Sequence, residues 1–99
     1  MSEAYASGNW HVTEGKEAEF VETWTELLQW TRQTQPGLRR ATLMRHEGQP
    51  QHFISFAEWE DGPSRDKWKA TLEFGELHGK CVKMCDEFTG GHFEPRVTI

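Results

Sequence analysis

The sequence lacks the features of a nucleic-acid-binding, membrane-spanning or secreted protein. Its 99 residues carry a formal net charge of −5, and no basic cluster exceeds the pair Arg39-Arg40, whereas a phosphate-binding surface needs a concentrated basic stripe. No apolar run approaches the roughly 20 residues that cross a bilayer, and residues 1–10 lack the basic and apolar segments of a signal peptide. We therefore expect a cytoplasmic protein with neither nucleic acid nor membrane as a partner.

Cysteine is scarce, and the two present, Cys81 and Cys85, stand four residues apart in a segment predicted to be helical. Side chains at this spacing point along one helix face in parallel, which is poor geometry for a disulfide. A zinc site would have to recruit His78 or His92, but structural zinc sites usually pair cysteines at shorter spacings and need four ligands. We expect two reduced, buried thiols and no bound metal.

Motifs of several common enzyme classes are also missing. The sequence contains no nucleophile elbow, no recognisable Ser-His-Asp arrangement and no glycine-rich phosphate loop after a strand. The remaining histidines form no recognisable group, because His46 and His52 flank a loop while His11 and His92 stand on separate predicted strands. These absences leave hydrolase and nucleotide-binding functions without support.

Large aromatic side chains, in contrast, are abundant. Five Trp and six Phe in a small acidic chain indicate either an extended core or a ligand cavity lined by rings. The densest stretch, His52–Trp59, is apolar on both faces of a pleated strand, which favours a strand covered on both sides. Asp61-Gly62 then ends the strand, and Pro63 or Ser64 begins a helix. We expect this strand and helix to form one wall of any pocket.

Hydrophobic periodicity predicts four strands and two helices in one domain of residues 1–99. The expected strands are residues 9–13, 38–45, 52–59 and 92–99, and the expected helices are residues 17–34 and 63–88. Residues 1–7 are small and polar and are expected to be a loose tail. The order β-α-β-β-α-β is that of the ferredoxin-like α+β fold, in which a four-stranded antiparallel sheet carries both helices on one face.

Glycine and proline refine the C-terminal half. Gly75 and Gly79 interrupt the second helix and allow a kink. Pro95 places the last strand at a sheet edge, because proline donates no ladder hydrogen bond. A lone domain of this fold leaves the other sheet face bare, and the apolar residues of His52–Trp59 on that face would then form an interface patch. We therefore expect a homodimer.

Four segments carry a family resemblance: Glu14–Phe20 with its glycine turn, Gln35–Leu38, Phe53–Asp61 and Thr71–Phe74. With them, nearly the whole chain resembles the antibiotic biosynthesis monooxygenase (ABM) domains of the dimeric α+β barrel superfamily. The resemblance implies a homodimer whose sheets pair back to back. It also implies, for part of the family, oxidation of small aromatic or quinol-like substrates by O₂ without metal or flavin.

The same resemblance names candidate site residues. In ordinary ABM domains a histidine commonly stands nine residues after the Trp that ends the third strand, and here Trp68 holds that place. A Trp there with a histidine ten residues later, here His78, is similar to the haem-degrading branch, in which the Trp packs on the porphyrin and the His ligates iron. Trp68 and His78 are therefore the catalytic candidates. The candidate ligand-binding residues are Trp10, Phe56, Trp59 and Phe74.

Both catalytic candidates also have a purely structural interpretation. Trp68 is then a core aromatic packed on the third strand, and His78 a hydrogen-bonded group on a helix flank. In a straight helix their separation places the two side chains about 80° apart around the axis, so a shared pocket requires a bend. As an iron ligand, His78 would also need to be neutral, with its second nitrogen held by a carboxylate or carbonyl.

The haem-degrading branch carries a third residue, an asparagine on the first strand that faces the helices. Counting back from Gly15, this position is Gly8 here, and Asn9 comes one residue later. In a regular strand Asn9 points to the opposite face, unless a bulge intervenes. The resemblance to this branch therefore covers two of its three residues.

Three functions remain, and fold alone does not choose among them. The leading hypothesis is a monooxygenase without a cofactor that oxidises a small aromatic or quinol-like substrate with O₂. The second is a haem-binding or haem-degrading protein that uses His78 and Trp68. The third is a non-catalytic dimer that binds a small ligand.

Overall fold

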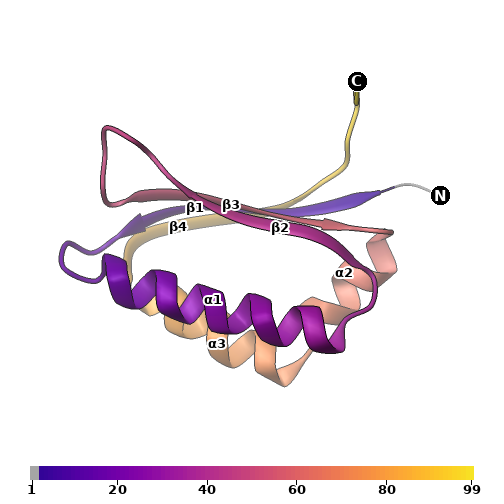
Figure 1. Cartoon of the computed structure of the whole chain (residues 1–99), viewed down its shortest axis with the longest axis horizontal. Coiled ribbons are helices and arrows are strands. Elements are labelled where there is room, and N and C mark those ends of the chain that lie inside the picture. Colours follow the sequence, from indigo (N-terminus) through magenta and orange to yellow (C-terminus); the bar gives the residue numbers. More distant parts are fainter. Residues whose placement is uncertain (1–2) are drawn as a thin grey trace.

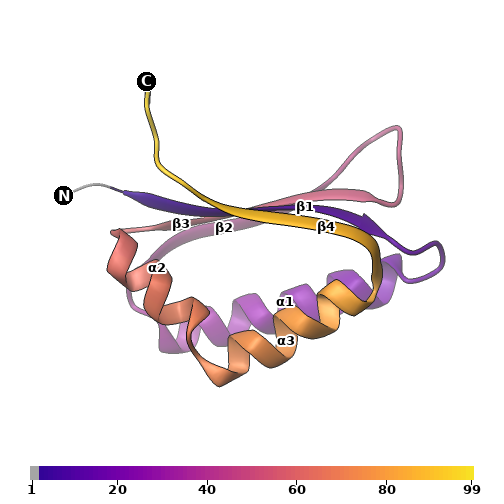
Figure 2. The same cartoon turned by 180° about the vertical axis from the view of Figure 1, so that it is seen from behind.

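The computed structural model describes residues 3–99 as one antiparallel sheet with helices on one face (Figure 1). The elements in chain order are β1 (Ala4–Val12), α1 (Glu17–Thr34), β2 (Leu38–Arg45), β3 (His52–Trp59), α2 (Gly62–Lys69), α3 (Leu72–Lys83) and β4 (Cys85–Phe93). Figure 2 shows the same layers from behind, with α1 and α3 side by side under the sheet and α2 at one end of it. The helices thus form one layer and the strands the other.

The strands follow the order β2-β3-β1-β4, and every neighbouring pair is antiparallel. This is the ferredoxin-like arrangement that the sequence predicts. Every second residue of β1 is buried, because side chains alternate between the two faces of a strand and only one face is covered by helices.

The core is packed around Trp10 of β1. Phe20, Trp24, Leu27 and Thr31 form the buried stripe of α1, at the three- and four-residue spacing of an amphipathic helix. The ring of Trp10 lies 5.2 Å from that of Phe20 and 5.9 Å from that of Trp24, both edge to face, which is the arrangement that aromatic pairs prefer. Trp10 thereby joins α1 to the sheet.

The first strand is longer than predicted, and the expected loose tail is wrong for residues 4–7. These residues belong to β1, where Ala4 pairs with Trp59 and Ser7 with Gly91. Small residues give a weak strand signal, but Ala4 and Ala6 fill the space between sheet and helices without steric conflict and are buried. Residues 1–2, the start of the predicted tail, lie outside the described residues.

The predicted second helix, residues 63–88, is three elements. α2 ends at Lys69, and Thr71 then caps α3 by accepting a hydrogen bond from the backbone N–H of Phe74. The break therefore lies before Gly75 and Gly79, where a kink was expected. No helix in residues 3–99 is long and apolar enough to cross a membrane.

The last strand begins earlier than predicted, at Cys85, and ends at Phe93. Cys85 and Phe88 therefore lie on β4, although the predicted helix over residues 63–88 includes them. The predicted strand over residues 92–99 is wrong beyond Phe93, and Pro95 follows the strand instead of lying within it. β4 is nevertheless an edge strand, as expected.

The sheet face away from the helices, here called the open face, exposes apolar side chains. Met44 of β2 and Ile54 and Phe56 of β3 lie there, each 37–40% exposed. β3 therefore alternates, with Phe53 and Trp59 buried under the helices. The prediction that both faces of this strand are covered is not met within one chain.

Candidate functional site

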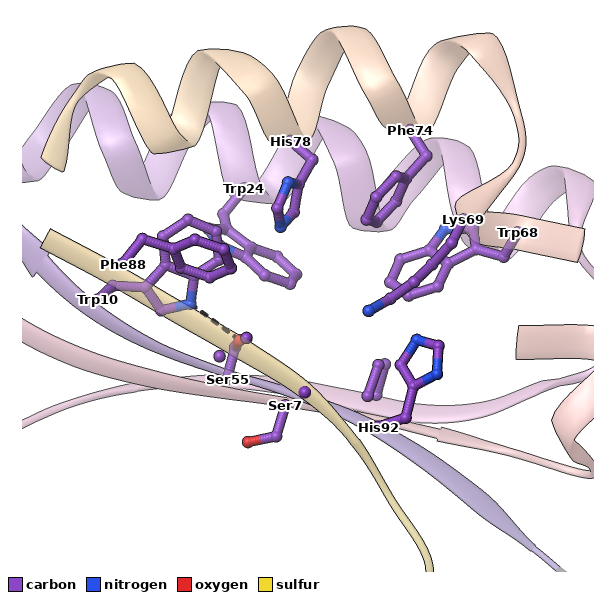
Figure 3. Close-up of a pocket in the computed structure, with 15 residues that line it drawn as sticks. Ser7, Trp10, Trp24, Ser55, Trp68, Lys69, Phe74, His78, Phe88 and His92 are labelled. Atoms are coloured by element: carbon purple, nitrogen blue, oxygen red, sulfur yellow. Dashed lines mark hydrogen bonds between the residues drawn. The ribbon is translucent and has the colours of Figure 1, made fainter. Parts of the chain in front are cut away.

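A cavity of about 480 Å³ lies between the sheet and the helices (Figure 3). Its lining comes from β1, β3, β4 and all three helices. Sites for small organic ligands typically measure about 300 to 1,000 Å³ and are lined mainly by apolar groups. The cavity therefore has the size and composition of a small-molecule site.

The break between α2 and α3 brings the two catalytic candidates to this cavity. Trp68 lies in the last turn of α2 and His78 in the second half of α3, and both line the cavity. Because Thr71 starts a new helix, the direction in which the side chains of α3 point around its axis does not follow from the helical spacing of α2. The bend that the sequence requires for a shared pocket is thus present, although not at a glycine.

His78 lies among aromatic rings. Its imidazole stacks on Phe74 with 4.6 Å between ring centroids and an interplanar angle of 19°. Trp10 and Phe88 approach it edge-on at 5.3 Å and 5.2 Å. Figure 3 shows the imidazole of His78 pointing from α3 towards the sheet, with Trp10, Trp24 and Phe88 around it. The ring is thereby held at the cavity wall by packing.

This environment favours the neutral form of the imidazole. Burial, with a smaller contribution from the positive charge of Lys69, lowers the pKa of His78 to about 4, because a desolvated cation is costly. Among residues 3–99, no group hydrogen-bonds to its ring nitrogens. His78 therefore offers the cavity a neutral imidazole at pH 7, and the carboxylate or carbonyl partner expected for an iron ligand is not present among these residues.

Two tryptophans of the cavity wall are held in place by hydrogen bonds from their indole N–H groups. Trp10 donates to Oγ of Ser55 at 3.0 Å, and Trp68 donates to Oγ1 of Thr31 at 2.9 Å. Within residues 3–99, the buried indole N–H groups of Trp24 and Trp59 have no hydrogen-bond partner. Trp24 lines the cavity, so an unsatisfied buried donor belongs to a lining residue.

The side of the cavity opposite Trp10 carries two basic groups beside the ring of Trp68 (Figure 3). Lys69 of α2 and His92 of β4 both line it, and Figure 3 shows their side chains directed into the space between helices and sheet. Burial lowers the pKa of Lys69, with Arg65 adding to this effect and Asp66 opposing it. Burial also lowers the pKa of His92, helped by the charges of Lys69 and Arg65. The cavity thus has an aromatic, neutral side and a side with basic groups.

The structure brings four of the six predicted site residues together. Trp10, Trp68, Phe74 and His78 line the cavity. Trp59 is fully buried behind Trp68, with 4.9 Å between ring centroids, and does not line it. Phe56 lies on the open face, because it occupies an outward position of β3.

Several residues that line the cavity were not predicted from the sequence to be site residues. They are Trp24, Ser55, Lys69, Phe88 and His92. Ser55 carries a signal, since the other inward positions of β3, Phe53, Ala57 and Trp59, are apolar. Lys69 directly follows Trp68, whereas His92 has no signal, because only the register of β4 against β1 turns it inward.

Asn9 lies on the open face, as its place in a regular strand predicts. Its side-chain oxygen contacts Nε2 of His52 at 2.6 Å, and the imidazole of His52 stacks on those of His11 and His46. The irregularity of β1 falls between His11 and Val12 and does not turn Asn9 inward. Asn9 is therefore separated from the cavity by the sheet.

Gly8 occupies the inward position and has no room for a side chain. A Cβ atom there would lie 2.6 Å from Nε1 of Trp10 and 2.9 Å from Oγ of Ser55, which is closer than real contacts allow. The space that an asparagine would need is taken by the hydrogen bond between Trp10 and Ser55. The third residue of the haem-degrading branch therefore cannot be supplied from β1 without repacking.

The two thiols lie away from the cavity lining. Cys81 is buried in α3, and Sγ of Cys85 lies 3.3 Å from the carbonyl oxygen of Cys81. Burial raises the pKa of Cys81 to about 12 and that of Cys85 to about 11. Within residues 3–99, no three His, Cys, Asp or Glu side chains are placed to hold a metal ion.

Fold and cavity together define a ferredoxin-like α+β domain with a small-molecule cavity between its sheet and its helices. The sequence profile of the family named Antibiotic biosynthesis monooxygenase (ABM) matches residues 5–80. The chain belongs to this family.

Solved structures share the fold. One similar protein is SnoaB, which is described as a cofactor-independent oxygenase from Streptomyces nogalater. The structure of a SnoaB mutant has a TM-score of 0.91 and 22% identity to this chain, and a second SnoaB structure has a TM-score of 0.86 and 23% identity. Each match covers 100% of this chain and 98% of the SnoaB chain. A conserved protein from Methanosarcina mazei Go1 has a TM-score of 0.84 and 19% identity, covering 94% of this chain and 92% of its own. No curated protein matches the sequence.

Proposed function

We propose that this protein is a monooxygenase without a cofactor that oxidises a small, electron-rich aromatic substrate in the cavity. The observation that carries the proposal is the neutral imidazole of His78 in a wall of aromatic rings. Membership of the ABM family and the described activity of SnoaB support it.

The cavity suits a flat aromatic ring. Trp10, Trp24, Trp68, Phe74 and Phe88 supply apolar surface, and such walls exclude water while an oxygen-sensitive anion forms. Trp68, fixed by Thr31, contacts the substrate ring in this proposal.

His78 acts as the base in this proposal: it is unprotonated at pH 7, and the substrate anion formed beside it would raise its pKa from about 4. A hydroxyaromatic substrate that loses a proton becomes an anion able to pass electrons to O₂, and a positioned base assists this transfer. Because no cofactor supplies electrons, the substrate supplies all of them. Where the substrate carries a ring CH₂ group, as an anthrone does, its two C–H bonds and the O–O bond break. One oxygen atom of O₂ forms the carbonyl, and the other leaves as water with the two hydrogens. This balance needs no external reductant.

We also propose that two copies of the chain pair through the open face. The exposed apolar side chains of Met44, Ile54 and Phe56 support this, since a patch of this kind on a sheet marks an interface. The pairing would give the dimeric α+β barrel implied by the family resemblance.

Oxygen uptake with a dihydroxyanthrone tests the oxygenase proposal. We expect consumption of O₂ faster than the spontaneous reaction, with one atom of isotopically labelled O₂ in the quinone product. His78→Ala should lower the enzymatic rate by about a hundredfold, and His46→Ala, on a loop away from the cavity, should leave it unchanged. Uptake at the spontaneous rate despite binding of the compound would contradict the oxygenase and leave the non-catalytic binder.

Haem binding is the second candidate function, because His78 is a neutral imidazole at an aromatic cavity, as an axial ligand must be. His78 would then hold the iron and Trp68 would pack on the porphyrin, and the haem would supply the redox chemistry. The crowded Gly8 and the outward Asn9 disfavour the degrading activity of that branch.

A haem titration separates the two candidates. A saturable Soret band that disappears in His78→Ala would make haem binding the leading candidate function. We expect no saturable band, and this result would exclude the hypothesis that the protein binds haem.

A further inference from the structure

We propose that Lys69, beside His92, is an anion-binding residue of the cavity, so that the ligand is an aromatic compound carrying a carboxylate. This inference rests on the proposed function for the cavity and specifies the class of substrate. It concerns the polar side of the cavity, opposite the aromatic side that holds His78 (Figure 3).

Position is the first argument. Lys69 lies in the last turn of α2 and His92 near the end of β4, and these elements bring both side chains to one side of the cavity. Figure 3 shows the ammonium group of Lys69 and the imidazole of His92 facing the same space. A flat ligand that packs against Trp10 and Phe88 can therefore extend a substituent to Lys69.

Charge is the second argument. No Asp or Glu lines the cavity among the described residues. The nearest acid on α2, Asp66, accepts a hydrogen bond from Nε of Arg65 at 3.1 Å and lies 3.9 Å from Nδ1 of His92. Lys69 forms no salt bridge within residues 3–99. The charge of Asp66 offsets only part of the effect of burial on the ammonium, and a ligand carboxylate in direct contact would offset more of it.

The protonation states assign the positive charge to Lys69. The pKa of His78 is about 4, and burial lowers the pKa of His92 from its ordinary 6.5. Burial lowers the pKa of Lys69 from its ordinary 10.5, and the charge of Asp66 opposes this shift and supports the ammonium form. A carboxylate bound there places the opposite end of the ligand at His78, so Lys69 orients the ring for the reaction.

Lys67 provides a matched control. Both lysines lie in the last turn of α2, where a positive charge stabilises the helix dipole. Lys67 is exposed and does not line the cavity. A role of Lys69 limited to the helix would therefore be shared by Lys67, whereas a role in binding would not.

The experiment compares two probes of nearly equal shape, anthracene-9-carboxylate and the neutral anthracene-9-methanol, through quenching of tryptophan fluorescence. The parent protein should bind the carboxylate at least about tenfold more tightly, as expected of a charge-assisted contact. Lys69→Met should abolish this preference by weakening the carboxylate alone, and Lys69→Arg should keep it. Lys67→Met should behave like the parent.

Equal affinity for the two probes in the parent, a preference that survives Lys69→Met, or no binding of either probe would each overturn the proposal. The measurement involves no turnover. Anion preference without oxygen uptake from a dihydroxyanthrone that carries a carboxylate would contradict the oxygenase and keep the anion site, while uptake without anion preference would contradict the anion site alone.

Discussion

The indole N–H of Trp68 donates a hydrogen bond of 2.9 Å to Oγ1 of Thr31, and this hydroxyl donates one of 2.7 Å to the carbonyl oxygen of Leu27. Trp68 and Thr31 are both buried. The pair joins α2 to α1 across the interior. It also fixes the orientation of a ring that forms part of the cavity wall.

Replacement of Thr31 by valine tests this relationship. Thr31→Val keeps the shape of the side chain but leaves the buried N–H of Trp68 without an acceptor, so the free energy of unfolding should fall by about 1–3 kcal/mol. Thr34→Val removes a similar hydroxyl, which donates to the carbonyl oxygen of Trp30 on the exposed side of α1, and should change stability by less than about 0.5 kcal/mol. Denaturant unfolding measures both, and equal losses would contradict the prediction.

The stability of the protein should depend on pH through His78. Its pKa is about 4 when folded and 6.5 by ordinary values, so between these pH values the unfolded chain binds a proton that the folded chain does not. The free energy of unfolding should therefore fall as the pH decreases from 6.5 to 4, by at most about 3 kcal/mol. His78→Phe should lose this part of the slope. Unfolding curves of parent and variant that stay parallel across this window would show that His78 does not contribute.

The open face should form the contact between two copies. Phe56→Arg, which places a charge at a position 39% exposed in the single chain, should convert a dimer into a monomer. Val21→Arg is the control, because Val21 is 40% exposed but lies on α1. Light scattering at micromolar concentration gives the mass of each. A monomeric parent, or a dimer in both variants, would refute the interface.

The thiols should react slowly in the folded protein. Burial, with Asp86 adding for Cys85, raises both pKa values, to about 12 for Cys81 and about 11 for Cys85, and only the thiolate is a nucleophile. Reaction with an aromatic disulfide reagent at pH 8 should therefore follow unfolding and accelerate in denaturant. Rapid modification of both cysteines without denaturant would contradict this.

Two glycines should respond to alanine in opposite directions. Gly8→Ala crowds Trp10 and Ser55 and should destabilise the fold by about 1–3 kcal/mol. A Cβ at Gly75 of α3 meets nothing within 4 Å, so Gly75→Ala should stabilise the helix by about 0.5–1 kcal/mol. Thermal unfolding of the two variants provides the comparison, and a stabilised Gly8→Ala would mean that the wall at Trp10 is loosely packed.

The sequence predicted the elements whose apolar spacing has one interpretation. α1 and β2 have the predicted bounds, since Phe20, Trp24 and Leu27 recur at helical spacing only. The predicted second helix is wrong beyond Lys83, because apolar residues at 81, 84, 85 and 88 continue the helical spacing although the chain turns into β4 at Cys85. The spacing of apolar residues along the chain cannot show that β1 provides a strand edge with which residues 85–93 pair.

The aromatic half of the cavity was more predictable than its polar half. Trp10, Trp68, Phe74 and His78 follow from large rings and from a family resemblance. Lys69 and His92 lie in α2 and β4, with α3 between them in the chain, and their approach depends on the register in which His92 pairs with Ala6. Such a meeting is a tertiary property that neither residue type nor local spacing encodes.

The cap at Thr71 makes α2 and α3 rotationally independent. One residue inserted into a continuous helix turns everything after it by about 100°. At the joint of Ala70 and Thr71, in contrast, each helix keeps the phase set by its own cap and packing. A change in loop length there would move Trp68 relative to His78 without turning either from the cavity. The length of this joint therefore sets the distance between Trp68 and His78 across the cavity that both residues line.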